Sequence, residues 1–430
     1  MAGSHLRTLP ITGLQVIGLG VCLTLSLSCQ PTLRGGSAVA QRTGPSSAAS
    51  ASSAASASSA ASASSAHQRA VTPAGPGGGG RAITPAPASQ ASGSAAVPAT
   101  APRFLKGQLH THSAGSYDAK EPPEALLRFY AERGYDFVAI TDHNRVSLAA
   151  PPTPAPAEAA MLVIPGAELT QNAAVCSGPP ATPGYRCLFH TSALFLQGVV
   201  AGQQIKLPFQ QERSAAYAAQ LAEAARFSGI AVLNHPNFHF AVDERLMARL
   251  VRGGLRLFEL SNAALDAQHP SGRGQAESRT EKLWDAVLSQ GLAVYGIATD
   301  DAHHFSEAEA RRRALKSAYT GDRGWVMVRA QRDPQAIREA LLAGDFYASS
   351  GVELSRLERS ATEFSVQVRA DGSRSSGPFT TRFIGRGGRQ LAQVAGEHAT
   401  YQVQGSEGYV RAVVVDAGGN KAWIQPVMIP

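Results

Sequence analysis

The sequence from residue 104 onward predicts a β/α barrel followed by a small antiparallel β-sandwich-like domain. Between residues 104 and 345, apolar runs alternate with helical patterns, which is the signature of βα units and a parallel sheet. Histidines and carboxylates repeatedly follow these runs, as polar side chains do at the active end of a β/α barrel. After Tyr347 polar and apolar residues alternate between Gly, Ser and Asp turns, which is typical of a small sandwich.

Each element is expected from its local pattern. Strands of the barrel are predicted at the short apolar runs 104–109, 136–140, 161–164, 187–196, 230–233, 255–260, 292–298 and 324–329. Helices with glycine or proline at an end are predicted at 125–133, 214–227, 243–251, 277–290 and 334–342. The sandwich strands are expected at 363–368, 380–384, 400–404, 409–415 and 421–429. Pro165-Gly166 predicts a turn after the third barrel strand.

The first residues predict an export signal. Arg7 precedes an apolar stretch, residues 11–27, that is too short for a secure membrane span. The segment 1–29, which ends at Cys29, resembles a bacterial lipoprotein signal. Cys29 is expected to be lipidated and to become the N-terminus of the mature protein after the signal is removed. Ser26 stands where such signals have a large aliphatic residue, and ordinary secretion with another cleavage point remains the alternative. The expected location is the bacterial cell envelope, with a lipid anchor in the membrane.

Residues 30–103 predict a disordered linker. Only Ser and Ala occur from 49 to 66, and a glycine run occupies 77–80, so this segment has too little apolar surface to bury. Six arginines and no acidic residue lie in the first 103 residues, so the net charge of +7 leaves +1 for the remainder. A nearly neutral domain without a basic stripe gives no electrostatic case for a nucleic-acid partner.

Two of the four cysteines, Cys176 and Cys187, bracket a loop rich in proline and glycine. An exported chain permits disulfides, and these two cysteines are a natural pair.

Short cassettes of histidine and carboxylate are the most informative motifs. They are His110-Thr-His112, Asp142-His143, Glu168, His190, His235 and Asp300-Asp301-Ala-His303. Imidazole and carboxylate are the ligands of borderline divalent metals, and Zn, Mn or Fe would suit this mixture. His110 and His112 are two residues apart on an extended segment, so both side chains point to one face and one ion could take both.

The motifs KGQLHTHS, VAITDHN, VIPGAELT, LNHPN and GIATDDAHH resemble those of the PHP (polymerase and histidinol phosphatase) metallohydrolase superfamily. The resemblance covers roughly residues 104–355 and implies a distorted seven-stranded (β/α)7 barrel with up to three metals. The segments KLWDAVLSQGLAVYGIATDDAHH and GWVMVRA are most similar to the CehA/McbA-type branch, in which a small β domain follows. The expected division is a barrel at 104–350 and a β domain at 351–430.

The resemblance implies three metal positions, and two or three divalent ions are therefore expected. The first position would use His110, His112, Glu168 and Asp301, the second Glu168, His190 and His235, and the third Asp118, His143 and His303. Asp118 follows the histidine pair later than in the family pattern, and the insertion between the cysteines obscures the spacing at His190. The Asp-x-His form favours Asp301 over Asp300 as the motif aspartate, which leaves Asp300 as a supporting residue.

A metal-dependent hydrolase that cleaves phosphomonoesters or phosphodiesters is the function predicted. A carboxylate between two cations positions them to share a hydroxide, the nucleophile, and phosphoryl oxygens bind between such ions. Glu168, Asp301 and Arg145 are the predicted catalytic residues, with Arg145 as a clamp for the substrate anion or else a surface arginine. Hydrolysis of a carbamate, ester or amide on the same scaffold is the alternative, and a non-catalytic metal-dependent binding protein is a second one.

Several nearby residues have open roles in the sequence. Glu259 and Asn262 end a predicted strand and are expected on the rim. Three asparagines could orient ligands or cap turns: Asn144, Asn234 and Asn237. The remaining histidines, expected to be structural or exposed, are His239, His269, His304 and His398.

Overall fold

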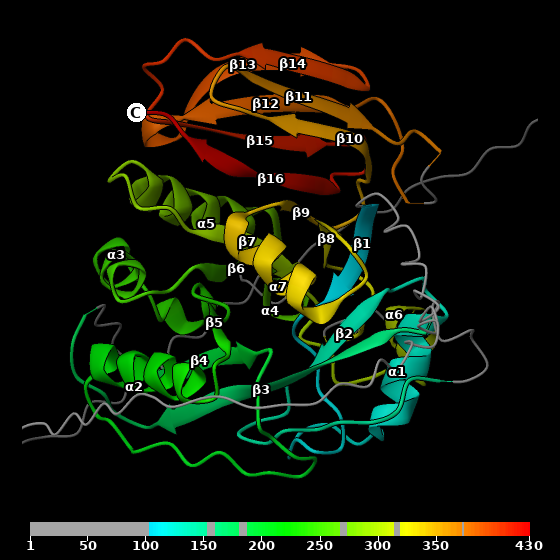
Figure 1. Ribbon diagram of the computed structural model, residues 1–430, viewed down its shortest axis with the longest axis vertical. Helices are drawn as coiled ribbons and strands as arrows, with labels where there is room; N and C mark the ends of the chain where they lie inside the picture. Colours follow the sequence, from blue (N-terminus) through cyan, green and yellow to red (C-terminus); the bar gives the residue numbers. More distant parts are fainter. Residues whose placement is uncertain (1–102, 153–159, 180–186, 267–272, 314–318, 372–373) are drawn as a thin grey trace, which may run out of the picture. The chain divides into compact units, whose positions relative to one another are not determined.

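The computed structural model describes residues 103–152, 160–179, 187–266, 273–313, 319–371 and 374–430 (Figure 1). The predicted signal peptide, Cys29 and the predicted linker up to residue 102 lie outside the described residues. Among the described helices, none combines the length and the apolar character that a membrane crossing requires.

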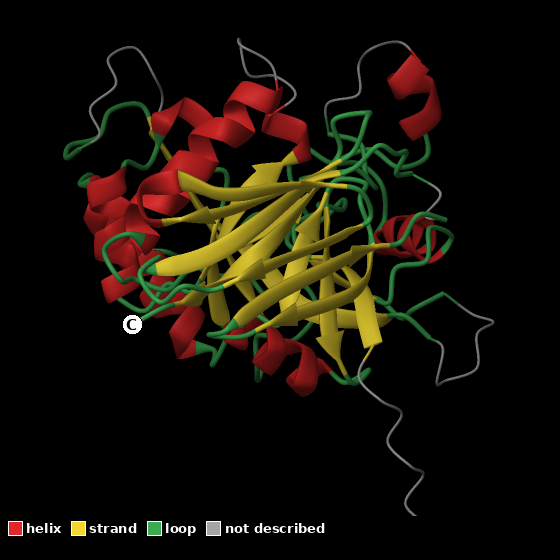
Figure 2. Ribbon diagram, turned by 90° about the horizontal axis from the view of Figure 1, so that it is seen from above, coloured by secondary structure: helices red, strands yellow, loops and turns green. Residues whose placement is uncertain are grey.

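Nine strands make up the part of the fold in which the barrel is expected. They are β1 (Arg103–Gln108), β2 (Phe137–Ile140), β3 (Leu162–Ala173), β4 (Cys187–Leu194), β5 (Ile230–Leu233), β6 (Leu257–Asn262), β7 (Tyr295–Thr299), β8 (Trp325–Ala330) and β9 (Phe346–Ser349). The helices are α1 (Pro123–Ala131), α2 (Arg213–Arg226), η2 (Phe238–Phe240), α3 (Glu244–Arg252), α4 (Ala263–Asp266), α5 (Arg273–Leu288), α6 (Ala308–Arg313) and α7 (Pro334–Ala343). Figure 2 shows the strands in the interior with helices around them.

The predicted all-parallel arrangement is wrong for part of this sheet. The pairs β1–β2, β2–β3, β5–β6 and β6–β7 are parallel, whereas β1–β8, β3–β4, β4–β5 and β8–β9 are antiparallel. The predicted turn at Pro165-Gly166 is also wrong, because β3 continues through it to Ala173. Strands β3 and β4 form a hairpin instead of a βα unit, and the loop between them carries the predicted Cys176–Cys187 disulfide, which is confirmed.

A closed (β/α)7 barrel is not confirmed. The large sheet has thirteen strands in the order β13-β12-β15-β16-β9-β8-β1-β2-β3-β4-β5-β6-β7, so β7 is an edge strand. Within the described residues no backbone pairing joins β7 to β8. The result is an α/β fold with one long, open mixed sheet.

The side chain of Asp300 links the end of β7 to the backbone that leads into β8. The fully buried Asp300, directly after β7, accepts hydrogen bonds from the backbone N–H groups of Asp322, Arg323 and Gly324, which lead into β8. It also accepts from Gln108 Nε2 at 2.7 Å and from the Tyr130 hydroxyl at 2.9 Å. Asp300 is therefore a structural residue that ties β1, α1 and the entry to β8 to the end of β7.

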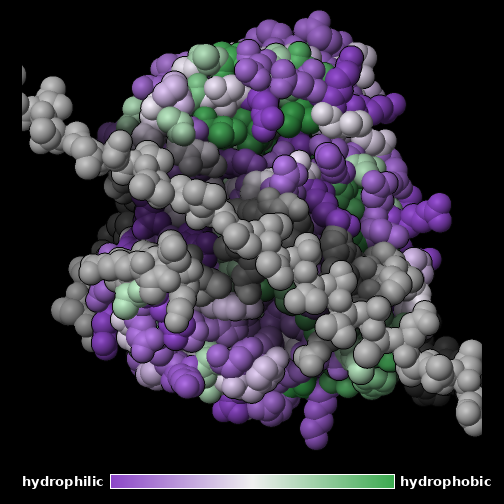
Figure 3. All heavy atoms as spheres, turned by 180° about the vertical axis from the view of Figure 1, so that it is seen from behind, coloured by the Kyte–Doolittle hydropathy of each residue, from purple (hydrophilic) through white to green (hydrophobic). Residues whose placement is uncertain are grey.

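The C-terminal strands β10 (Leu354–Arg359), β11 (Glu363–Val368), β12 (Thr380–Gly385), β13 (Arg389–Ala395), β14 (His398–Gln402), β15 (Tyr409–Val415) and β16 (Lys421–Met428), with the short helix η3 (Arg386–Gly388), form an antiparallel sandwich. Its smaller sheet is β10-β11-β14, and its other strands belong to the large sheet through the β9–β16 pair. Phe364 and Tyr401 from the smaller sheet contact Phe383 from the large one, with ring centroids 5.9 and 5.5 Å apart. On the face seen in Figure 3, hydrophobic residues show between hydrophilic ones over these strands.

A buried charge pair joins the sandwich to α5, which lies alongside β16 (Figure 1). Arg411 is 1% exposed, and its Nε and Nη2 each donate to Asp285 at 2.7 Å. The Tyr409 hydroxyl donates to the same carboxylate at 2.7 Å. A bidentate pair with this geometry fixes the orientation of both groups, and losing either partner would leave an uncompensated buried charge.

Gln425 supplies a strand-like partner for the free edge of β7. Its Oε1 accepts from Gly296 N at 2.9 Å and its Nε2 donates to Gly296 O at 2.7 Å, with the side chain fully buried. The C-terminal sandwich thus satisfies both backbone groups of an edge-strand residue that would otherwise be buried without partners.

Replacing Gln425 by Met should therefore lower the free energy of unfolding by about 3 kcal/mol, because two buried backbone groups lose their partners while the side chain keeps its length. Urea unfolding followed by circular dichroism measures this. Gln402→Met on the exposed face of β14 is the matched control and should change stability by less than about 0.5 kcal/mol. Equal stability of the two variants would contradict the role assigned to Gln425.

Candidate metal centre

The histidine and carboxylate cassettes converge on one side of the large sheet. His110 and His112 follow β1, His143 follows β2, His235 follows β5, and the Asp301 cassette follows β7. Glu168 differs from expectation, because it lies within β3 instead of beyond a strand end, whereas His190 lies within β4, inside the strand expected at 187–196. They still join the site because Thr170 pairs with His190 in the hairpin and Glu168 bridges to His143.

Three groups of side chains each bring ligand atoms within 4.8 Å of one another and could hold a metal ion. The groups are His110, His112 and Asp301; Glu168, His190 and His235; and His112, Asp118, His143 and His303. These are the nine residues to which the sequence resemblance assigns metal ligation, so the fold brings the whole predicted set together. His112 differs in lying within reach of two groups.

The buried carboxylate of Glu168, 1% exposed, lies at the centre of the cluster. Four imidazole nitrogens lie within 3.4 Å of its oxygens: His143 Nδ1 at 2.7 Å, His190 Nδ1 at 3.1 Å, His110 Nε2 at 3.3 Å and His235 Nε2 at 3.4 Å. Burial alone would raise the pKa of Glu168, but the neighbouring imidazoles outweigh burial and hold the pKa well below its ordinary value. Glu168 is therefore ionised and able to serve more than one cation.

The donor set around Asp301 fits a divalent cation. Nε2 of His110 and Nε2 of His112 lie 3.1 Å apart, and each lies within 3.4 Å of Asp301 Oδ1. Two imidazole nitrogens that face each other so closely cannot both carry a hydrogen, whereas their lone pairs and the carboxylate oxygen can share one cation. Burial, followed by the nearby His303, lowers the pKa of His112 to about 4, so this ring is neutral at pH 7 as a ligand must be.

Asp118 completes the third group despite its unusual spacing. Its Oδ2 lies 3.2 Å from His143 Nε2 and 3.5 Å from His303 Nε2, and its side chain is 38% exposed. Burial would raise the pKa of Asp118, but hydrogen bonds from the two imidazoles lower it. Burial would likewise lower the pKa of His143, while Glu168 and Asp118 raise it to about 10. The carboxylates of Asp118 and Glu168 therefore favour a positive charge at this position, as a cation site requires.

Most of the histidine ligands are also held from behind. Glu259 lies 2.6 Å from His110 Nδ1, and its other oxygen accepts from His235 N at 2.6 Å. Further partners are Ser116 on His112 Nδ1, Thr170 on His143 Nδ1 and Asn172 on His190 Nε2, at 2.7 to 2.9 Å. Such bonds fix ring orientation and leave the other nitrogen for the ion.

The sequence pattern indicated only part of this support. Glu259 was expected on the rim because it ends an apolar run, but its bond to His110 had no sequence signal. Ser116, Thr170 and Asn172 were not singled out at all, because isolated polar residues in these positions resemble ordinary turn or strand residues. Asn144 and Asn234 do orient site elements: Asn144 bonds both backbone groups of Thr170, and Asn234 Nδ2 donates to Glu168 at 2.8 Å.

Three site residues adopt left-handed backbone conformations that non-glycine residues rarely adopt. They are Asn144 (φ 51°), His235 (φ 26°) and Asp301 (φ 50°). Tertiary hydrogen bonds hold the last two, since His235 N donates to Glu259 and Asp301 N donates to His110 O at 3.0 Å. Such strain, about 1–3 kcal/mol for each residue, persists where the surroundings over-determine the backbone, as they do at functional sites.

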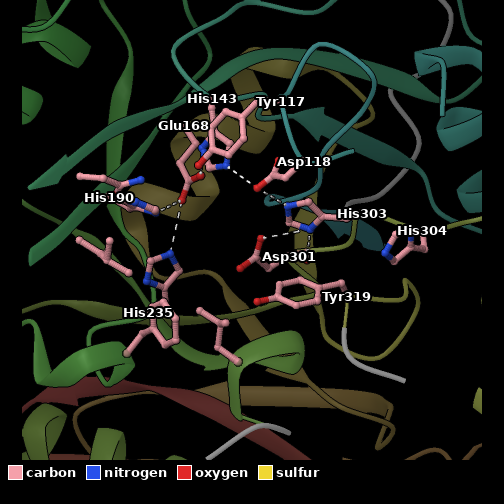
Figure 4. Close-up of a pocket in the computed structure, with 14 residues that line it drawn as sticks. Tyr117, Asp118, His143, Glu168, His190, His235, Asp301, His303, His304 and Tyr319 are labelled. Carbon is pink, nitrogen blue, oxygen red and sulfur yellow. Dashed lines mark hydrogen bonds and ion pairs between the residues drawn. The ribbon is translucent and has the colours of Figure 1, made fainter. Parts of the chain in front are cut away.

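A pocket of about 460 Å³ opens onto the cluster, and Figure 4 shows the labelled side chains around it. Two tyrosines flank it: the ring of Tyr117 stacks on His143 at 4.7 Å, and that of Tyr319 meets His303 edge-on at 4.9 Å. Arg145 is not among the described residues that line this pocket, so its role as a substrate clamp or as a surface arginine stays a prediction. Its Nη1 lies 2.9 Å from the side-chain amide of Gln204, whose oxygen accepts the bond.

No protein-family model and no curated protein matches this sequence. Among solved structures, a two-domain protein from Bacteroides vulgatus containing a predicted PHP-like metal-dependent phosphoesterase is 15% identical, with 79% of this chain and 100% of that chain covered and a TM-score of 0.42. A protein from Bifidobacterium adolescentis, named as a metal-dependent phosphoesterase, is 14% identical over 56% of this chain and 96% of that one, with a TM-score of 0.32. An amidohydrolase from Chromobacterium violaceum is 15% identical over 47% and 88%, with a TM-score of 0.29.

The first two of these structures are named as metal-dependent phosphoesterases. The name of the first also includes the term PHP-like, and PHP is the superfamily whose motifs this sequence resembles. The function proposed below rests on the side chains of the site itself.

Glu259→Gln should weaken metal binding by about 10- to 100-fold. Both carboxylate oxygens of Glu259 now accept hydrogen bonds, and in glutamine the amide NH2 group would face one of those donors instead. The loss is expected at the two groups that Glu259 supports, one through His110 and one through His235. Competition titration of the purified protein with a chromophoric chelator measures it, with Glu358→Gln on the exposed surface as control. An affinity within threefold of that of the unchanged protein would show that Glu259 does not support the ligand.

Proposed function

We propose that this protein is a metal-dependent hydrolase of phosphate esters, of the PHP superfamily and its CehA/McbA-type branch. The observation that carries the proposal is the position of the ionised, buried Glu168 carboxylate. Its Oε1 lies 3.3 Å from His110 Nε2 in one group of ligands and 3.4 Å from His235 Nε2 in another. A carboxylate in this position serves two cations at once, which is the arrangement of two-metal hydrolases.

Two or three divalent ions, Zn, Mn or Fe, suit the mixed imidazole and carboxylate ligands. When bound, such ions supply Lewis-acid activation of water and neutralise charge on a phosphoryl group. Asp301 and Glu168 would supply carboxylate ligands to them, and Glu259 and Ser116 orient imidazoles of the set. The burial of Glu168 and His112 excludes bulk water from behind the ligands.

The pocket geometry supports hydrolysis without a side-chain nucleophile. The described residues that line it include neither serine nor cysteine, while they include seven of the nine residues of the three groups. Water in the pocket would therefore be the attacking group, and Asp301 and His303 line the same pocket. Carbamate, carboxyl ester and amide substrates remain outcomes of the substrate panel below.

We also propose that the chain is exported and tethered by a lipid on Cys29. The Cys176–Cys187 disulfide supports the first half of this proposal, because structural disulfides persist in oxidising compartments. Metabolic labelling with a fatty acid, compared between the full chain and Cys29→Ser, tests the second half.

Glu168→Gln should reduce phosphodiester hydrolysis by more than about 100-fold, since residues that only support ligands already contribute 10- to 100-fold. Bound metal should fall by at least one equivalent in elemental analysis, while far-ultraviolet circular dichroism stays unchanged. A panel of phosphomonoesters, phosphodiesters, carbamates, carboxyl esters and amides gives the reaction class. Equal activity of Glu168→Gln and the unchanged protein would exclude the shared-carboxylate arrangement.

Removal of the ions with a chelator should abolish activity and lower the thermal midpoint, because bound ions stabilise only the folded state. Readdition of Zn, Mn or Fe should restore both quantities, and differential scanning calorimetry reads the second independently of turnover. A thermal midpoint and activity that are both insensitive to the chelator would contradict metal dependence.

A further inference from the structure

The pocket is lined by apolar side chains as well as by the candidate metal ligands. Three hydrocarbon side chains line it on the side of His190 and His235: Leu188, Phe238 and Leu265, which together we term the apolar wall. The wall faces the same space as Glu168 and Asp301. A hydrocarbon surface open to water beside a charged centre is stabilised when an apolar group covers it.

Each member of the apolar wall is placed by a residue of the metal cluster. Leu188 precedes His190 by two positions on β4, so strand alternation puts both side chains on one face. Phe238 follows His235 closely: its N–H donates to His235 O at 2.8 Å, and the two rings meet edge-on at 5.6 Å. Leu188 and Phe238 are therefore held in place beside His190 and His235, two ligands of the second group.

Leu265 is fixed by a similar chain of bonds. Its N–H donates to Asn262 Oδ1 at 3.0 Å, and Asn262 Nδ2 donates to Asp301 Oδ2 at 3.2 Å. Leu265 is 8% exposed, and Leu188 and Phe238 are half-buried, so the wall already has packed neighbours behind it and one free face in front. An apolar ligand would meet a preformed surface.

Resting on the proposed function, we infer that the substrate is a phosphate ester whose organic group beside the reacting phosphorus is apolar and of aryl size, and that Leu188, Phe238 and Leu265 bind this group. Sugar and nucleoside groups fit less well on this side. Their hydroxyl groups would lose their hydrogen bonds to water and would face side chains that offer none in return. The phosphoryl group would then lie toward Glu168 and Asp301, with Tyr117 and Tyr319 along the opposite side.

The first test measures binding without turnover. Phenylphosphonate and methylphosphonate have no ester bond, and above pH 8.5 both are dianions, so they differ in the organic group alone. Calorimetric titration of the metal-loaded full chain should give a phenylphosphonate affinity about tenfold higher than that of methylphosphonate. Leu188→Ala and Leu265→Ala, made separately, should each reduce this preference at least about threefold, whereas Val200→Ala, outside the pocket and 66% exposed, should leave it unchanged.

The second test uses phenyl 4-nitrophenyl phosphate and methyl 4-nitrophenyl phosphate, which share a leaving group. Preferential hydrolysis of the phenyl diester, reduced in the two wall variants through KM, supports the inference. Equal affinities for phenylphosphonate and methylphosphonate would overturn it while leaving the proposed function intact. Failure of the metal-loaded protein to bind either phosphonate or to hydrolyse either diester would instead overturn the proposed function itself.

Discussion

The placement of one buried carboxylate organises this molecule. Glu168 is removed from water and surrounded by imidazoles from the ends of β1, β2 and β5 and from within β4. An isolated charge in that position would be strongly destabilising, so the strands are constrained to bring positive or metal-binding partners to it. The register of the sheet, the left-handed backbone at His235 and the support from Glu259 all serve this one requirement.

The same requirement explains why the sandwich supports the site. Asp301 and His303 follow β7, an edge strand that pairs with β6 on one side only. Asp300 ties the end of β7 to the entry of β8, and Gln425 from β16 bonds the strand itself. The predicted boundary at residue 350 falls beside β9, which pairs with β16 in the same sheet, so ligand positions depend on residues on both sides of it.

The sequence allowed the ligands to be predicted more fully than the architecture. All nine candidate ligands come together, and the resemblance of successive motifs, taken in order, had implied them as a set. Strand direction is not readable in this way: the apolar run before His190 looks the same whether β4 is parallel or antiparallel to β3. Bonds such as Gln425 to Gly296 join residues 129 apart, and Gln425 in isolation resembles any polar strand residue. The choice between a substrate clamp and a surface arginine for Arg145 stays open in the same way, because adjacency to His143 in sequence does not fix where its guanidinium lies.

Chemistry and specificity share one register in the β3–β4 hairpin. Thr170 pairs with His190 and Asn172 with Leu188, so the ligand, its support and the first residue of the apolar wall lie on one face. Slipping the pairing by one residue would turn all of them to the other face at once. The Cys176–Cys187 disulfide lies at the loop end of this hairpin, where Ala173 pairs with Cys187, and thereby restricts such slippage. A change of substrate preference in this scaffold is therefore easier through Phe238 or Leu265, which lie outside the hairpin, than through β4, where altering the wall also risks the metal ligand.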